Sequence, residues 1–263
     1  MPAVLVNWSL LQFQALVLIL MRVSPILFMM PVFSSRSLPN LLKAGLTLTV
    51  SLILLPLVQL DPRLLPSEPI QFGLLMAAEL MIGLILGLSV KIIFTGIQMS
   101  GELAGFQMGL SLASVMDPQS EVNAPILSQF LYLVSLVVFL AVDGHHWFFR
   151  ALYQSFLLLA PGEIHLQEGL YRHFLGLLTS LFVVAIKIAA PVMAVLIFTQ
   201  IGLGILAKAV PQINILITSF PLTLGIGLLF LALSIELILP TLKNLFQQTG
   251  RELVFTLLPL MQR

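Results

Sequence analysis

The chain has 263 residues, of which 59% are hydrophobic and 9% charged, with a net charge of +1. Soluble domains carry about a quarter charged residues, so this composition excludes a soluble monomer and predicts an integral membrane protein. The near-neutral charge provides no basic surface for nucleic acid. The absence of cysteine excludes disulfides and thiol catalysis.

Long apolar segments predict membrane helices, because a spanning helix needs about 20 mostly apolar residues. The last two apolar segments, 174–206 and 213–239, form a hairpin, and an amphipathic helix over 241–258 follows it. The expected fold class is therefore all-α, a polytopic membrane protein built from helical hairpins. In chain order, the expected segments are 10–33 (interrupted at Arg22 and Pro25), 38–60, 72–99, 126–142, the shorter 147–159, 174–206 and 213–239.

Six charged residues lie within or beside these apolar segments. Each would cost roughly 2.5–3.5 kcal/mol or more if it faced lipid at the bilayer centre. They therefore face protein or water, or lie outside the hydrocarbon layer. One interpretation is an ion or substrate path; the other is salt bridges between subunits, or helices displaced from the membrane. The six residues are Arg22, Glu79, Lys91, Glu102, Lys187 and Glu236.

The stretch over 101–125 differs from its neighbours. Gly101, Gly105 and Gly109 recur every four residues, a spacing that lets two helix backbones approach closely. The following residues are apolar but contain the turn-forming pair Asp117-Pro118, which predicts a non-helical apolar segment. Irregular backbone at membrane depth is tolerated only inside protein or along a cavity. A compressible plug and ordinary packing beneath a loop are both open interpretations.

The histidines and the catalytic motifs give little support for an enzyme. His145 and His146 lie beside Asp143, but adjacent histidines on a helix rarely point the same way, and no pair of ligands is spaced four apart. We therefore expect no metal site. The sequence contains no nucleophile elbow, phosphate-binding loop or HExxH motif, so we expect no enzymatic activity and no cofactor.

Taken together, several short motifs resemble the FliR family of flagellar export-gate proteins, whose virulence-system counterparts are the SctT-type export apparatus proteins. The resemblance covers essentially the whole chain. The motifs are Gly101-Glu102, Gly105, Gln107-Met108-Gly109-Leu110-Ser111, Asp117-Pro118, Ser120, Asn123, Pro125, Gly144-His145, Val210-Pro211-Gln212-Ile213-Asn214 and Phe220-Pro221-Leu222.

The resemblance implies a subunit that assembles with FliP-type and FliQ-type proteins into a helical pore in the bacterial inner membrane, within the flagellar basal body. It implies a FliP-like part over 1–173, including a plug-like loop over 101–125. A FliQ-like hairpin over 174–240 and a C-terminal amphipathic helix over 241–263 follow. FlhB-type and FlhA-type export proteins, unfolded export substrates and membrane lipid are the implied partners, without nucleic acid.

Two hypotheses about individual residues follow from this resemblance. The first is that an apolar plug closes the pore by dewetting, while Gly101, Gly105 and Gly109 let the loop bend. The second is that polar residues, together with residues at the tip of the predicted hairpin, contact partner proteins instead of transporting ions. The expected plug residues are Phe106, Met108, Leu110, Leu112 and Met116; the expected partner contacts are Glu102, Lys208, Pro211, Gln212 and Asn214.

Three alternatives remain open at this stage. A self-contained secondary transporter or channel would show an internal repeat and broken helices at matching positions, and Pro25 and Pro191 do not lie in corresponding surroundings. A scaffold without a conducting function would tolerate deletion of the plug with no change in leak. A subunit of a virulence-type secretion apparatus would share the fold and the motifs.

Overall fold

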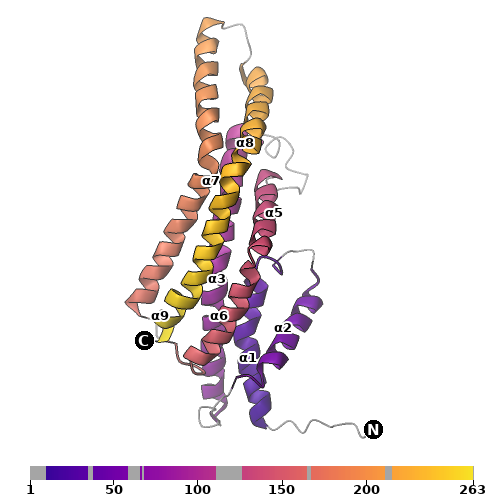
Figure 1. Ribbon diagram of the computed structural model, residues 1–263, viewed down its shortest axis with the longest axis vertical. Coiled ribbons are helices and arrows are strands. Elements are labelled where there is room, and N and C mark those ends of the chain that lie inside the picture. Colours follow the sequence, from indigo (N-terminus) through magenta and orange to yellow (C-terminus); the bar gives the residue numbers. More distant parts are fainter. Residues whose placement is uncertain are drawn as a thin grey trace. The chain divides into compact units, whose positions relative to one another are not determined.

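The computed structural model describes residues 10–34, 38–58, 66, 68–110, 126–164, 167–210 and 215–262, without the side chains of 215–218. Every regular element in these ranges is helical, which confirms the all-α fold class. In chain order (Figure 1) the elements are α1 (Leu10–Met29), α2 (Asn40–Leu54), α3 (Pro69–Met108), α5 (Ile126–Ala141), α6 (Gly144–Leu158), α7 (Glu168–Ala209), α8 (Ile215–Glu252), the π-helical turn η2 (Leu253–Leu257) and α9 (Leu258–Gln262).

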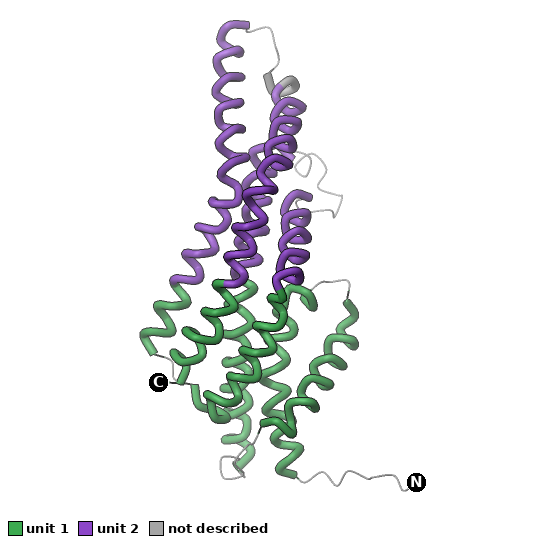
Figure 2. Tube along the Cα trace, in the orientation of Figure 1, with its two compact units in different colours: residues 1–91, 143–175, 248–263 green, residues 92–142, 176–247 purple. Residues whose placement is uncertain are grey.

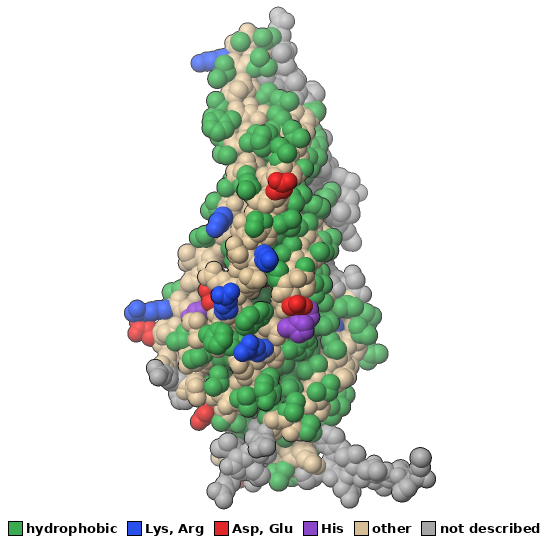
Figure 3. Space-filling model, in the orientation of Figure 1, with side chains coloured by type: hydrophobic (Ala, Val, Ile, Leu, Met, Phe, Trp, Pro, Cys, Tyr) green, Lys and Arg blue, Asp and Glu red, His purple; other side chains and the backbone are tan. Residues whose placement is uncertain are grey.

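Four helices are long and apolar enough to cross a membrane: α1, α3, α7 and the continuous C-terminal run over 219–262. Helices α5 and α6 also pass this test when they are counted together as one broken span. Hydrophobic side chains cover much of the visible surface, and charged side chains are few (Figure 3). These observations support the prediction that the chain is a membrane protein.

Some predicted element boundaries are wrong. Helix α2 is shorter than expected: it begins after Pro39, whose backbone is extended with ψ of 139°, and it ends at Leu54, shortly before Pro56, which has no amide to donate to the helix. Helix α1 continues through Pro25. Helix α8 likewise continues through Pro240, so the expected start of a separate amphipathic helix at 241 is not a helix boundary. Membrane helices tolerate such prolines, because neighbouring groups satisfy the freed backbone.

The chain divides into two compact units (Figure 2). Unit 1 comprises 1–91, 143–175 and 248–263, and unit 2 comprises 92–142 and 176–247. Helices α3, α7 and α8 each contribute residues to both units. The FliP-like and FliQ-like division expected from the resemblance stays a prediction.

The core of unit 2 contains a cluster of aromatic rings. Phe94 of α3 stacks on Phe246 of α8, with 5.1 Å between ring centroids. Phe139 and Tyr132 of α5 approach the Phe94 ring edge-on, at 5.5 and 5.9 Å. Aromatic pairs in these geometries contribute about 0.5–1.5 kcal/mol each beyond the area that they bury. This cluster fixes the middle of α3 against α5 and α8, and thereby positions the carboxyl end of α3.

Candidate functional site at the carboxyl end of helix α3

Helix α3 extends through the glycine repeat and ends at Met108. The expectation that a loop begins at Gly101 is therefore wrong for 101–108, which are helical. The helix ends because Gly109 adopts a left-handed conformation, with φ of 86°. The Gly109 amide donates to the Phe106 carbonyl at 3.1 Å, and the Leu110 amide donates to the Gly105 carbonyl at 3.0 Å. This pair of bonds is a helix-terminating motif in which glycine occupies the left-handed position.

Gly101 lies at a close approach of α3 and α5. A Cβ added at Gly101 would lie 2.5 Å from the Ser128 Cα and 2.7 Å from the Ser128 nitrogen. The Ser128 hydroxyl donates to the Gln98 carbonyl at 2.9 Å, which links the two helices at the same level. At Gly105, by contrast, the nearest atoms to an added Cβ lie 3.8 Å away. Gly101 is thus required for close packing, whereas Gly105 has room for a methyl group.

Met108 packs inside unit 2. Its side chain is fully buried and lies against Gly227 of α8, where an added Cβ would approach the Met108 Cγ to 2.6 Å. The Thr223 hydroxyl lies 3.3 Å from the Met108 carbonyl and shares its one hydrogen with the Ser219 and Phe220 carbonyls of its own helix, at 2.9 and 3.1 Å. Carbonyls at the end of a helix lack partners within that helix, and this shared bond reaches one of them. The end of α3 is therefore anchored to α8 through both the side chain and the backbone of Met108.

The opposite face of α3 is exposed. Glu102 and Phe106 are four residues apart and so lie on one side of the helix, and 73% of the Phe106 surface is exposed. Leu110 is half-buried. Of the five expected plug residues, Met108 is buried, Phe106 is exposed and Leu110 is half-buried. The other two, Leu112 and Met116, lie outside the described part of the chain.

The expected partner-contact residues fall into two groups. Glu102 on α3 and Lys208, in the last turn of α7, are described and exposed. Pro211, Gln212 and Asn214 lie outside the described residues. The two described residues are therefore accessible for partner contacts, and their assignment stays a prediction.

Unit 1 contains a buried ion pair that the sequence does not predict. The guanidinium of Arg22 on α1 binds both carboxylate oxygens of Glu79 on α3, at 2.5 and 2.8 Å. The two side chains are 0% and 1% exposed. Arg22 also donates to the Ser155 carbonyl at 2.7 Å, and Glu79 accepts the Gly162 amide at 3.0 Å. Two of the six expected intramembrane charges thus pair within the chain, rather than between subunits or along an ion path.

The sequence held one indication of this pair: a single arginine in one apolar segment and a single glutamate in another. Four further charges in the apolar segments made it impossible to choose this pair from the sequence. These four residues are all exposed: Lys91, Glu102, Lys187 and Glu236. Glycine also assists the pairing of α1 with α3, because an added Cβ at Gly83 would clash with the Arg22 carbonyl.

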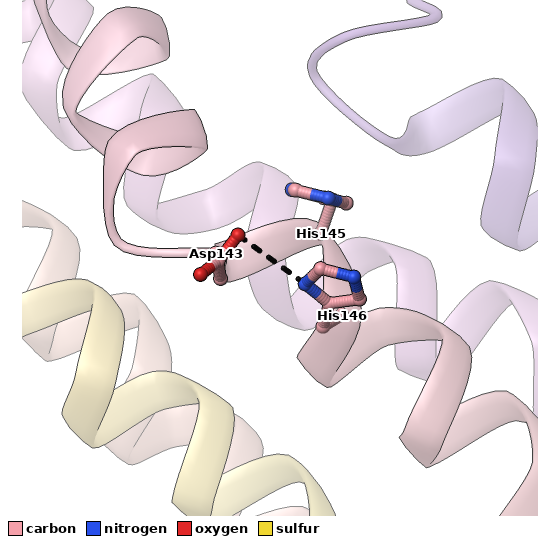
Figure 4. Close-up of side chains that lie close together, drawn as sticks. All are labelled: Asp143, His145 and His146. Carbon is pink, nitrogen blue, oxygen red and sulfur yellow. Dashed lines mark ion pairs between the residues drawn. The ribbon is translucent and has the colours of Figure 1, made fainter.

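The expectation that His145 and His146 point apart is also wrong. Their ring centroids are 4.2 Å apart. Each of Asp143, His145 and His146 offers a ligand atom within 4.8 Å of the other two (Figure 4). Both histidines lie in the first turn of α6, which begins at Gly144 after a left-handed residue at Asp143, so their adjacent positions on a helix did not keep the two rings apart.

Comparison with known proteins identifies the family. Residues 13–249 match the family described as bacterial export proteins, family 1. The chain is 32% identical over 247 residues to the flagellar biosynthetic protein FliR of Pectobacterium carotovorum subsp. carotovorum, covering 93% of this chain and 91% of the relative. It is 30% identical over 234 residues to FliR of Escherichia coli strain K12, covering 87% of each.

FliR of Bacillus subtilis strain 168 is 29% identical over 240 residues, which cover 90% of this chain and 92% of the relative. The family match over residues 13–249 includes residues of both compact units and of every described helix from α1 to α8. The chain belongs to the FliR family of bacterial export proteins.

Proposed function

We propose that this chain is a subunit of the flagellar protein-export apparatus in the bacterial inner membrane, where it helps to form a pore for unfolded polypeptide. The observation that carries the proposal is the match of residues 13–249 to the family, together with the flagellar names of its relatives. Those names favour the flagellar branch over the virulence branch. A subunit of this kind needs no enzymatic activity and no cofactor of its own.

The lengths of the helices support an assembly rather than a solitary carrier. Helix α7 has 42 residues and α3 has 40, so each extends about 60 Å. The hydrocarbon core of a bilayer is about 30 Å thick, so roughly half of each helix lies outside it. Large exposed apolar side chains nevertheless occur along α7 from Leu175 to Leu206. Apolar surface outside the hydrocarbon requires protein cover, which FliP-type and FliQ-type subunits would provide.

This proposal predicts a large mixed complex after gentle solubilisation. A tagged copy of the chain, produced in its own host, should co-purify with the FliP-type and FliQ-type subunits, as identified by mass spectrometry. Its native mass should exceed that of the 28.9 kDa monomer severalfold. A secondary transporter would instead run as a monomer or as a symmetric assembly of this chain alone, and that result would reject the proposal.

The plug proposal now rests on Phe106, Leu110 and the segment that follows. An exposed apolar ring at the end of α3 is suited to closing a lumen by dewetting, whereas the buried Met108 would anchor the base of the segment. Glu102 and Lys208 remain available to partners, with FlhB-type or FlhA-type proteins as the proposed contacts. Gly109 ends the helix in a left-handed conformation.

We expect Phe106→Ala to increase ion leak through the assembled gate severalfold without unfolding the chain, because the ring is 73% exposed. Leak is measured as the decay of a pH gradient in inverted inner-membrane vesicles. Phe198→Ala on α7 is the matched control, since Phe198 is 74% exposed and lies on a different helix. Deletion of 111–116 should increase leak further. A gate that stays tight in both Phe106→Ala and the deletion variant while export continues would refute the plug.

A further inference from the structure

The turn between α5 and α6 places three metal-binding side chains together, and no part of the proposed export function uses them. Asp143 has φ of 56° and ψ of 32°, and among the described residues it is the one non-glycine with positive φ. Aspartate tolerates this left-handed conformation better than most residues. The His146 amide donates to the Asp143 carbonyl at 3.0 Å, so the backbone folds tightly at this point. The turn brings the Asp143 carboxylate close to residues that start the next helix.

The Asp143 side chain does not act as a helix cap. An aspartate immediately before a helix commonly accepts hydrogen bonds from the first backbone amides, but the Asp143 carboxylate makes no such bond. Its Oδ1 lies instead 3.4 Å from the His146 Nδ1, as Figure 4 shows. Two ligands that each lie about 2.0–2.2 Å from a tetrahedral Zn²⁺ are about 3.3–3.6 Å apart. The observed separation thus matches that of two ligands sharing one ion.

His145 lies beside this pair of side chains. Its ring lies 4.2 Å from the ring of His146, measured between centroids. Its Nδ1 is buried and has no hydrogen-bond partner within the described part of the chain. Buried polar atoms are nearly always paired, and an unpaired one calls for an explanation such as an absent ion. Coordination of a metal ion by this nitrogen would satisfy it.

We propose that Asp143, His145 and His146 form a binding site for a divalent transition-metal ion of the Zn²⁺ class. Two imidazoles and one carboxylate are the donors preferred by Zn²⁺, Co²⁺, Ni²⁺ and Cu²⁺, whereas Mg²⁺ and Ca²⁺ prefer oxygen alone. All three ligand atoms lie within 4.8 Å of one another, so small side-chain rotations close the site. The side chains of His146 and Asp143 are 69% and 71% exposed, which lets the ion enter from solvent and leaves positions for water.

The test is a Co²⁺ titration of the full-length chain, purified in detergent with a tag free of histidine and stripped with chelator. Co²⁺ is a suitable probe because its visible absorption reports nitrogen and oxygen coordination. We expect one Co²⁺ per chain, displaced by Zn²⁺ but not by excess Mg²⁺. Asp143→Asn and His146→Gln should each weaken binding at least about tenfold, because each removes one of three ligands. Asparagine also tolerates the left-handed backbone at 143.

His173→Gln on α7 is the matched control, because it removes a histidine of the same unit that is not part of the cluster. Its Co²⁺ affinity should equal that of the unsubstituted chain. The two exposed cluster residues can be replaced without disturbing the core, and size-exclusion chromatography confirms that the variants stay folded. Absence of Co²⁺ binding, or equal binding by the cluster variants and the control, would overturn the site. Neither outcome bears on the export function, which the test does not measure.

Discussion

Replacing Arg22 with leucine is expected to destabilise the purified chain by roughly 3–5 kcal/mol, because it leaves the Glu79 carboxylate buried without its cation. For a domain of this size, that corresponds to a fall of about 10 °C in the thermal midpoint. The loss has a second component: the Ser155 carbonyl at the end of α6 loses the donor that lies 2.7 Å away. Thermal unfolding in detergent, followed by intrinsic fluorescence, measures the change.

Two further variants separate charge from packing. The double variant Arg22→Met with Glu79→Leu should recover much of the lost stability, because an apolar pair of similar volume avoids the desolvation of both charges. Arg172→Leu is the matched control. Arg172 also binds a glutamate, Glu168, at 2.6 Å, but both side chains are 75% exposed, so the effect should be under about 1 kcal/mol. Equal losses in Arg22→Leu and Arg172→Leu would show that burial of the pair does not matter.

Replacing Gly101 with leucine is expected to abolish flagellar export and to lower the stability of the chain. The added side chain would meet the backbone of α5 at Ser128 and Leu127, which cannot move without separating the two helices. Overpacking a dense interior costs typically about 1–3 kcal/mol, and here it would also break the bond from Ser128 to the Gln98 carbonyl. Motility of a strain whose only copy carries the substitution, with the level of the protein in the membrane, measures both effects.

Gly105→Ala provides the comparison that separates packing from hinge motion. Gly105 lies one turn further along α3, where an added Cβ meets nothing closer than 3.8 Å. Alanine is favoured over glycine in a helix interior by about 1 kcal/mol, so this variant should be as stable as the original chain or more so, and should keep its motility. If the glycines instead act as hinges, Gly105→Ala should impair export while leaving the folded chain intact.

The sequence was sufficient to predict the membrane class, the all-α fold and the family, because all three depend on composition, apolar segments and short motifs. It was insufficient at the end of α3. Glycine-rich sequence favours a loop in water, but 101–108 are helical because Gly101 permits close contact with α5 and Met108 packs against Gly227. Contacts between residues far apart in sequence decided that boundary.

The same reason explains the two side-chain arrangements that were missed. The Arg22–Glu79 pair joins residues 57 positions apart, and nothing local to either residue identifies its partner among several charges. Asp143 precedes α6 in a left-handed conformation, which a helical projection of the sequence does not include, and such a projection also does not place the rings of His145 and His146 together. The functions of the individual plug and contact residues stay predictions until the variants above are measured.

We expect the buried Arg22–Glu79 pair to affect the order in which the helices reach their final positions during synthesis. Arg22 is synthesised before both of its partners: Glu79 follows it by 57 residues. Ser155, whose carbonyl accepts a further hydrogen bond from Arg22, follows it by 133 residues. During that interval, helix α1 carries an uncompensated cation, which opposes stable residence in lipid. An unpaired arginine at the bilayer centre costs roughly 2.5–3.5 kcal/mol or more, so we expect α1 to reach its final position only after α3 has been synthesised.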